Sequence, residues 1–160
     1  MPKLTPRRIT RKYNENLFLL DINQGIKETG IKMKLFTNYI STESLPNTYS
    51  TLEKFLPSIL DSKCFNEDNL SFDEEVRATE VGHLFEHILL EYLTKLKLFY
   101  DNEDISFSGT TSWDWNRDEE GIFHIRINAG VREAHIFEEA LEKSIRLINK
   151  IIKTHLSSIN

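Results

Sequence analysis

Three residues near the middle of the chain, His83, Glu86 and His87, have the types and the spacing of a small metal-binding or catalytic group. They lie within residues 79–100, where apolar side chains recur at the three- and four-residue spacing that predicts a long amphipathic helix. An α-helix turns about 100° per residue, so side chains at positions i, i+3 and i+4 share one face. Two imidazole rings and a carboxyl group are therefore expected to converge.

The two histidines lie away from the apolar stripe of this predicted helix. That stripe is formed by Leu84, Phe85, Ile88, Leu89, Tyr92, Leu93 and Leu96. The histidines point to the opposite side, which argues against ordinary core histidines. A solvated polar face is the alternative interpretation, but Leu90 lies between the motif residues, and a mixed face of this kind suits cover by another part of the chain.

The spacing His-x-x-Glu-His has a defined chemical meaning. It is the inverted zincin signature of pitrilysin-like metallopeptidases, in which two histidines bind Zn²⁺ and the glutamate between them acts as general base on water. We therefore predict that His83 and His87 are metal ligands, that Glu86 is the catalytic base and that Zn²⁺ is the cofactor.

A catalytic zinc centre usually has three protein ligands and a water, so the motif needs one more residue. The first turns of a predicted C-terminal helix could reach the histidines, and Glu133, just after a predicted strand, is our first choice. The alternatives are Glu138, Glu139, Glu142 and His135. Each of these is also explained by an ordinary solvated helix face.

The rest of the chain alternates short apolar runs with turn signals. Residues 15–22 and 31–40 predict strands, and residues 105–115 and 122–130 predict the two arms of a β-hairpin. Residues 50–61 predict a short helix that Pro57 must either begin or break, and residues 131–157 predict a long terminal helix. We expect an α+β fold of two layers, with a small, mostly antiparallel sheet and two long helices packed on one face.

Two tryptophans stand out near the tip of the predicted hairpin. Trp113 and Trp115 are two residues apart and would point the same way from a strand. They could grip a ligand or pack against the sheet.

Composition narrows the possible functions. The chain has 160 residues, of which 39% are hydrophobic and 28% charged, and this balance predicts one folded domain spanning residues 1–160. A formal net charge of −5 disfavours nucleic acid as a partner, and the short basic stretch at residues 6–12 is explained by a strand edge or arm.

The sequence also limits where the protein is expected to be located and whether it can form a disulfide. No apolar run approaches the roughly 20 residues of a membrane span, and the N-terminus lacks a secretory apolar region, so we expect no membrane partner and a cytoplasmic protein. Cys64 is the only cysteine, which excludes an internal disulfide and leaves packing as its expected role.

The order of these features resembles a known domain. The segments ENLFLLDI, LPSILDSKC, ATEVGHLFEHILLEYL and GIFHIRINAG, followed by a helix ending ALEKSIRLI, are similar to the N-terminal domain of cyanophycin synthetase. The central signature of that family is a Gly-His-x-x-Glu-His segment on a helix, matched here by residues 82–91. The chain differs from the family in its acidic stretch before the motif and in the thinner set of acids that opens the last helix, VREAH.

The resemblance implies a connection with an ATP-dependent ligase that builds a poly-aspartate chain with arginine branches. The catalytic domains of that ligase have no room in 160 residues. What the resemblance implies for this chain is either zinc-dependent hydrolysis of cyanophycin or a related peptide polymer, which could make chain ends for a ligase, or a non-catalytic polymer-binding or structural role. Expected partners are the polymer, ligase domains and further copies of the chain in a homo-oligomer.

Overall fold

One antiparallel sheet forms the first layer of the protein. The computed structural model describes residues 5–12, 17–62 and 71–158. Within them, the strands are β1 (Arg7–Lys12), β2 (Phe18–Gln24), β3 (Thr29–Leu35), β4 (Gly109–Ser112) and β5 (Ile122–Ile127). Their order across the sheet is β1-β2-β3-β5-β4, and every neighbouring pair is antiparallel. The expected hairpin is therefore present as β4 and β5, and β4 lies at the edge of the sheet.

Helices form the second layer. They are α1 (Thr48–Phe55), the single turn α2 (Phe72–Glu75), α3 (Val81–Asp101) and α4 (Ala134–Ser158), with short 3₁₀ turns at Thr42–Ser44, Pro57–Asp61 and Val131–Glu133. Pro57 begins a new turn after α1 because proline lacks the N–H that would continue the helix. The two long predicted helices correspond to α3 and α4.

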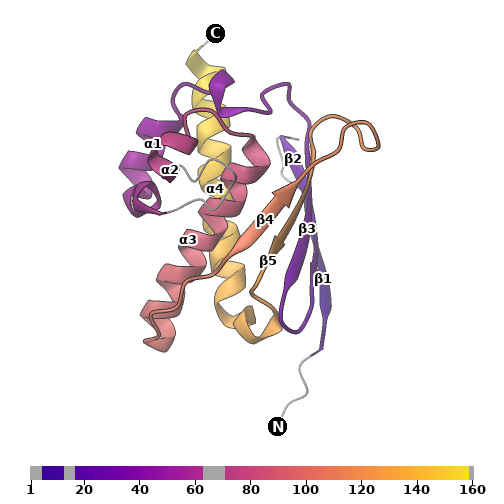
Figure 1. Ribbon diagram of the computed structural model, residues 1–160, viewed down its shortest axis with the longest axis vertical. Coiled ribbons are helices and arrows are strands. Elements are labelled where there is room, and N and C mark those ends of the chain that lie inside the picture. Colours follow the sequence, from indigo (N-terminus) through magenta and orange to yellow (C-terminus); the bar gives the residue numbers. More distant parts are fainter. Residues whose placement is uncertain (1–4, 13–16, 63–70, 159–160) are drawn as a thin grey trace.

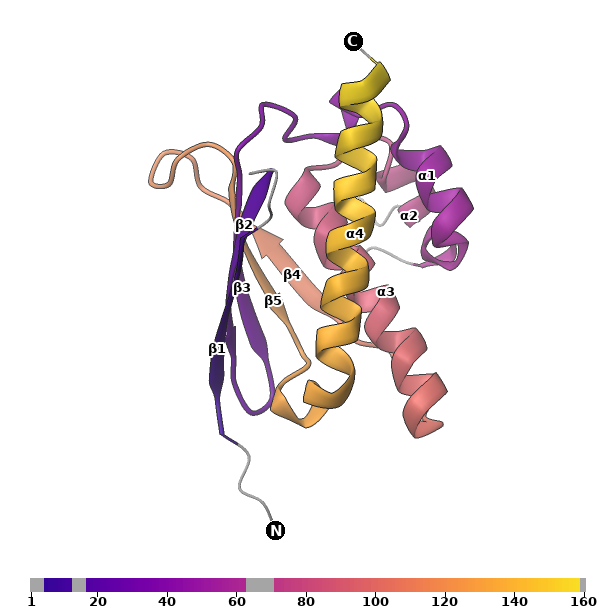
Figure 2. The same cartoon turned by 180° about the vertical axis from the view of Figure 1, so that it is seen from behind.

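All four helices lie on the same side of the sheet, and no described element covers its other face (Figures 1 and 2). The alternation along β2 shows why: Phe18, Leu20 and Ile22 are buried under the helices, whereas Asp21 and Asn23 face the other way. The structure thus confirms the two-layer α+β architecture.

The two tryptophans pack on the sheet. The rings of Trp113 and Trp115 both contact Phe123 edge to face, each with a centroid distance of 5.7 Å. The indole N–H of Trp115 donates to the carbonyl of Ile122 at 3.0 Å. These contacts support the packing interpretation.

Two further expectations concern the membrane and the cysteine. None of the described helices is long and apolar enough to cross a bilayer. Cys64 lies outside the described residues.

Candidate metal centre between α3 and β4

The first two turns of α3 carry the motif and are held tightly in place. The N–H of Val81 donates to the carbonyl of Ile40 at 2.8 Å, which ties the start of the helix to the segment after β3. Gly82 follows, and a Cβ atom built there would lie only 2.2 Å from Cγ of Phe123 on β5. The helix therefore approaches the sheet as closely as a glycine permits, one residue before His83.

His83 and His87 face each other across one turn of α3. Their Nε2 atoms are 3.1 Å apart, and the hydroxyl of Thr79 lies 2.7 Å from Nδ1 of His83. The ring of His87 stacks on Phe72 of α2 with a centroid distance of 4.2 Å. Phe72 of α2 thus covers one side of His87, which is only 9% exposed.

The Nε2 atoms of the two histidines share a hydrogen bond, and their charge and spacing also suit two ligands of one metal ion. Burial lowers the pKa of His83, although the carboxylates of Glu75 and Glu80 oppose this, and burial together with His83 lowers the pKa of His87 to about 3. Both rings are therefore neutral near pH 7, which is the form that binds metals. In a tetrahedral zinc centre with Zn–N distances near 2.0–2.1 Å, two nitrogen ligands lie about 3.3 Å apart, close to the separation found here.

Glu86 lies beside the pair and is almost fully buried, with 3% of its area exposed. Its carboxylate accepts a hydrogen bond of 2.7 Å from the hydroxyl of Thr111 on β4. Burial raises the pKa of Glu86 to about 7, because a carboxylate loses hydration there and the one hydrogen bond only partly compensates. Glu86 can therefore take up or release a proton close to neutral pH.

The three motif residues open into one cavity of about 490 Å³. One wall is the face of α3 that carries His83, Glu86, His87, Leu90, Glu91 and Thr94, and the other is residues 106–111, with Ser62 also lining the cavity. Such a volume, with a few converging polar groups, is typical of a small-molecule or peptide site.

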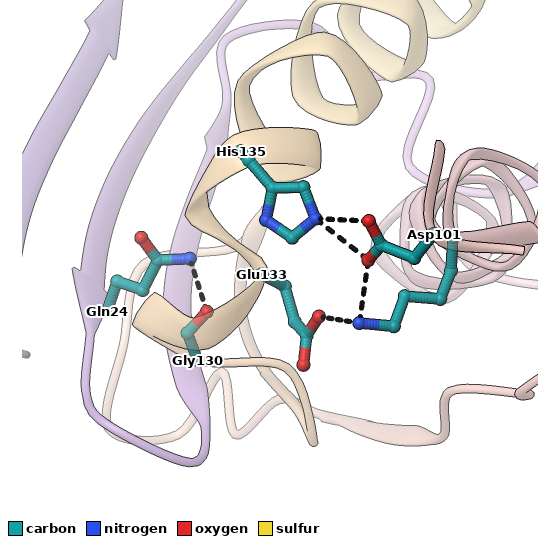
Figure 3. A network of polar contacts seen from close by, with 6 residues as sticks. Gln24, Asp101, Gly130, Glu133 and His135 are labelled. Carbon is teal, nitrogen blue, oxygen red and sulfur yellow. Dashed lines mark hydrogen bonds and ion pairs between the residues drawn. The ribbon is translucent and has the colours of Figure 1, made fainter. Parts of the chain in front are cut away.

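Glu133, the expected third ligand, is not at this cavity. Its carboxylate accepts from the ammonium of Lys97 at 2.9 Å, and Lys97 also pairs with Asp101 at 2.9 Å (Figure 3). Lys97 is ten residues beyond His87, about 15 Å further along α3. The structure therefore places Glu133 in an ion-pair network that joins the end of α3 to the start of α4.

The alternative ligands are also elsewhere. His135 contacts Asp101 in the same network, at 2.8 Å, Glu138 lies 3.8 Å from Arg7, Glu139 interacts with Tyr100, and Glu142 pairs with Arg146. Among the described residues, no group of three or more His, Cys, Asp or Glu side chains is arranged to hold a metal ion. The structure brings together His83, Glu86 and His87 and leaves the third ligand unassigned.

One comparison with known proteins identifies the family. Residues 30–153 match the family model of the cyanophycin synthase-like N-terminal domain. The chain belongs to this family. No curated protein matches the sequence. In this cyanophycin synthase-like domain the match includes the motif helix, β4, β5 and most of α4, whereas β1 and β2 precede it.

Several residues of the site were not predicted from the sequence. Thr79 contacts His83, Thr111 contacts Glu86, and Phe72 covers His87. Glu75 was also overlooked, although its charge acts on His83. Only Thr79 carried a usable signal, because it stands four residues before His83, one helical turn away.

The raised pKa of Glu86 predicts a pH-dependent stability difference for this cyanophycin synthase-like domain. Below pH 4.5 the carboxyl group is protonated in the folded and unfolded states alike, and as the pH rises to about 7 only the unfolded state ionises freely. Between pH 4.5 and about pH 7, the free energy of unfolding of wild type should therefore fall by up to about 3 kcal/mol relative to that of Glu86→Gln. Urea denaturation of both proteins at pH 4.5 and pH 7.5, with a chelator present, measures this difference in the free energy of unfolding. A difference that is the same at both pH values would contradict the raised pKa of Glu86.

Proposed function

We propose that this domain is a metal-dependent hydrolase that cleaves peptide bonds in cyanophycin or a related peptide polymer. The observation that carries the proposal is the convergence of the two histidine Nε2 atoms, 3.1 Å apart, with the carboxyl group of Glu86 on one open cavity. His83 and His87 hold the metal, and Glu86 is the general base.

Each group of the chain has a distinct task in the proposed reaction. A bound Zn²⁺ would lower the pKa of water and polarise the carbonyl group of the peptide bond. Glu86 accepts a proton from the water while the oxygen of that water bonds to the carbonyl carbon. Glu86 then delivers the proton to the leaving nitrogen as the C–N bond breaks. Thr111 donates to the carboxylate of Glu86 and orients it, and Thr79 orients the ring of His83.

Further donors to the metal would come from the acids that flank His83. Glu75 on α2 and Glu80 at the start of α3 are the two carboxylates whose charges act on His83. As placed, neither completes a group of three metal-binding side chains with the two histidines among the described residues. Either would therefore have to swing towards the pair to add an oxygen donor of the kind found in catalytic zinc sites.

The metal content of the purified protein tests the proposal. We expect near-stoichiometric zinc in wild type and a loss of at least tenfold in zinc affinity in His83→Ala and in His87→Ala, because each removes one of the few ligands. Glu75→Gln and Glu80→Gln, measured beside them, identify which acid contributes.

Two controls make this measurement specific. His124→Ala removes an exposed histidine that pairs with Asp118, and Glu133→Gln removes the carboxylate that pairs with Lys97. Both variants should keep the metal. Wild-type protein that takes up no zinc after dialysis against the ion would overturn the metal-dependent function.

A second candidate is a non-catalytic domain that binds the polymer. It is favoured by the finding that the described residues supply no third ligand beside the histidine pair. Retention of polymer on the wild-type protein, with no cleavage in the presence of zinc, would select this function.

A further inference from the structure

The strand β4 is both an edge of the sheet and a wall of the cavity. Its outer side pairs with no other described strand, because β4 is last in the sheet order. Residues 106–111 face the motif side of α3 across the cavity. The strand lies close to the acid, since a Cβ atom built on Gly109 would be 3.4 Å from Cγ of Glu86.

The hydrogen-bond pattern shows which backbone groups of β4 are directed outwards. Just beyond the end of β5, the N–H of Asn128 donates to the carbonyl of Ser108 at 2.9 Å, and the N–H of Ser108 donates to Oδ1 of Asn128 at 2.8 Å, so these two residues occupy a hydrogen-bonded position of the ladder. In an antiparallel ladder such pairs alternate with pairs that make no mutual bonds. By the register, Thr110 and Ser112 also bond to β5, whereas the N–H and C=O groups of Gly109 and Thr111 point to the free edge.

The two edges of the sheet differ in protection. The sequence of β1, RRITRK, contains four basic residues, and charges of this kind deter a further strand from pairing. The sequence of β4, GTTS, has no charged residue and no proline. An uncharged edge strand is a template for strand addition, and here it runs beside the candidate centre.

We propose that an extended peptide chain binds as an added strand along β4, with main-chain hydrogen bonds to Gly109 and Thr111, and crosses the α3 face of His83, Glu86 and His87. The identity of this chain as a polymer of the cyanophycin type rests on the proposed function. The mode of binding rests on the backbone of β4.

The dimensions of the site suit a short stretch of peptide. From His83 to Thr94 the cavity face of α3 is about 16 Å long at 1.5 Å per residue. An extended chain rises about 3.3 Å per residue, so this face spans about five residues. Within these five residues of the bound peptide, two would pair with Gly109 and Thr111 of β4, and alternate side chains would point towards α3.

Residue-resolved amide hydrogen exchange tests the proposal. The protein is Glu86→Gln, and the probe is a synthetic decapeptide of aspartate with arginine on every side-chain carboxyl group. At saturation, exchange of the Gly109 and Thr111 amides should slow at least tenfold, while Thr110 and Ser112, already bonded to β5, should change little. Saturable binding without this alternation, or no saturable binding, would overturn the proposal.

Modified probes separate strand pairing from side-chain recognition. A decapeptide N-methylated at every second residue keeps one bonding edge and should bind much as the parent does. A decapeptide N-methylated at every residue should bind at least tenfold more weakly. Cleavage of the polymer by wild type, measured alongside, separates this proposal from the proposed function. Cleavage without slowed exchange would support the hydrolase and contradict binding along β4. Slowed exchange without cleavage would support binding along β4 and contradict the hydrolase.

Discussion

Glu86→Gln is expected to lower the rate of polymer cleavage by about 10²–10⁴-fold while the protein keeps its metal. Glutamine has nearly the shape of glutamate, and its carbonyl oxygen can still accept the hydrogen bond from Thr111. Its amide group cannot take a proton from water. The substitution therefore removes proton transfer and leaves the histidine pair and the cavity intact. Release of arginine-bearing peptides from insoluble polymer, per bound zinc, is the quantity to measure.

Two further variants sharpen this result. Glu86→Asp keeps an acid but draws it back from the cavity, so it should recover part of the lost rate. Glu142→Gln changes an exposed glutamate on α4 that pairs with Arg146, and it should cleave as wild type does. Equal rates in wild type and Glu86→Gln, at equal zinc content, would remove Glu86 from the mechanism.

The architecture was largely predictable because it depends on local periodicity. The apolar stripes of α3 and α4 extend over many turns, and β2, β3 and β5 alternate clearly between buried and more exposed residues. The first arm of the hairpin was overestimated, since β4 begins at Gly109 and not at Ile105. Ile105 is exposed and Phe107 lines the cavity, so the alternation of residues 105–108 arose without a ladder.

The site was predictable only where a single helix determines it. The spacing of His83, Glu86 and His87 makes them converge in any helix. The position of Glu133 depends on where the start of α4 meets α3, and no local pattern reports that position. In the folded protein the carboxylate of Glu133 pairs with Lys97 at 2.9 Å, about 15 Å along α3 from His87. The contact of Thr111 with Glu86 likewise depends on the packing of β4 against α3.

The second large effect is expected at Gly82, where α3 touches the sheet. A methyl group there would overlap the base of the Phe123 ring, which is fully buried and in contact with both tryptophans. The base of the ring is held by the backbone of β5, so the helix itself must move. Gly82→Ala should lower the free energy of unfolding by roughly 1–3 kcal/mol, although alanine alone favours a helix over glycine by up to about 1 kcal/mol.

Gly30→Ala is the matched control, because a Cβ atom built on Gly30 meets nothing within 4 Å. That variant should unfold within about 0.5 kcal/mol of wild type, or at slightly higher urea. Combining Gly82→Ala with Phe123→Ala, which removes Cγ and Cδ1, the two atoms nearest to the added methyl group, should cost less than the sum of the two single changes. Simple additivity in this cycle would show that Gly82 is not limited by Phe123.

The same contact links stability to the chemistry of the site. Gly82 immediately precedes His83, and the depth at which α3 meets β5 sets how Glu86 reaches Thr111 on the neighbouring strand β4. A helix lifted from β5 would lengthen that hydrogen bond and open the cavity. Gly82→Ala should therefore lower polymer cleavage under conditions where it is still folded, and Gly30→Ala should not. Unchanged cleavage by folded Gly82→Ala would show that the close packing serves stability alone.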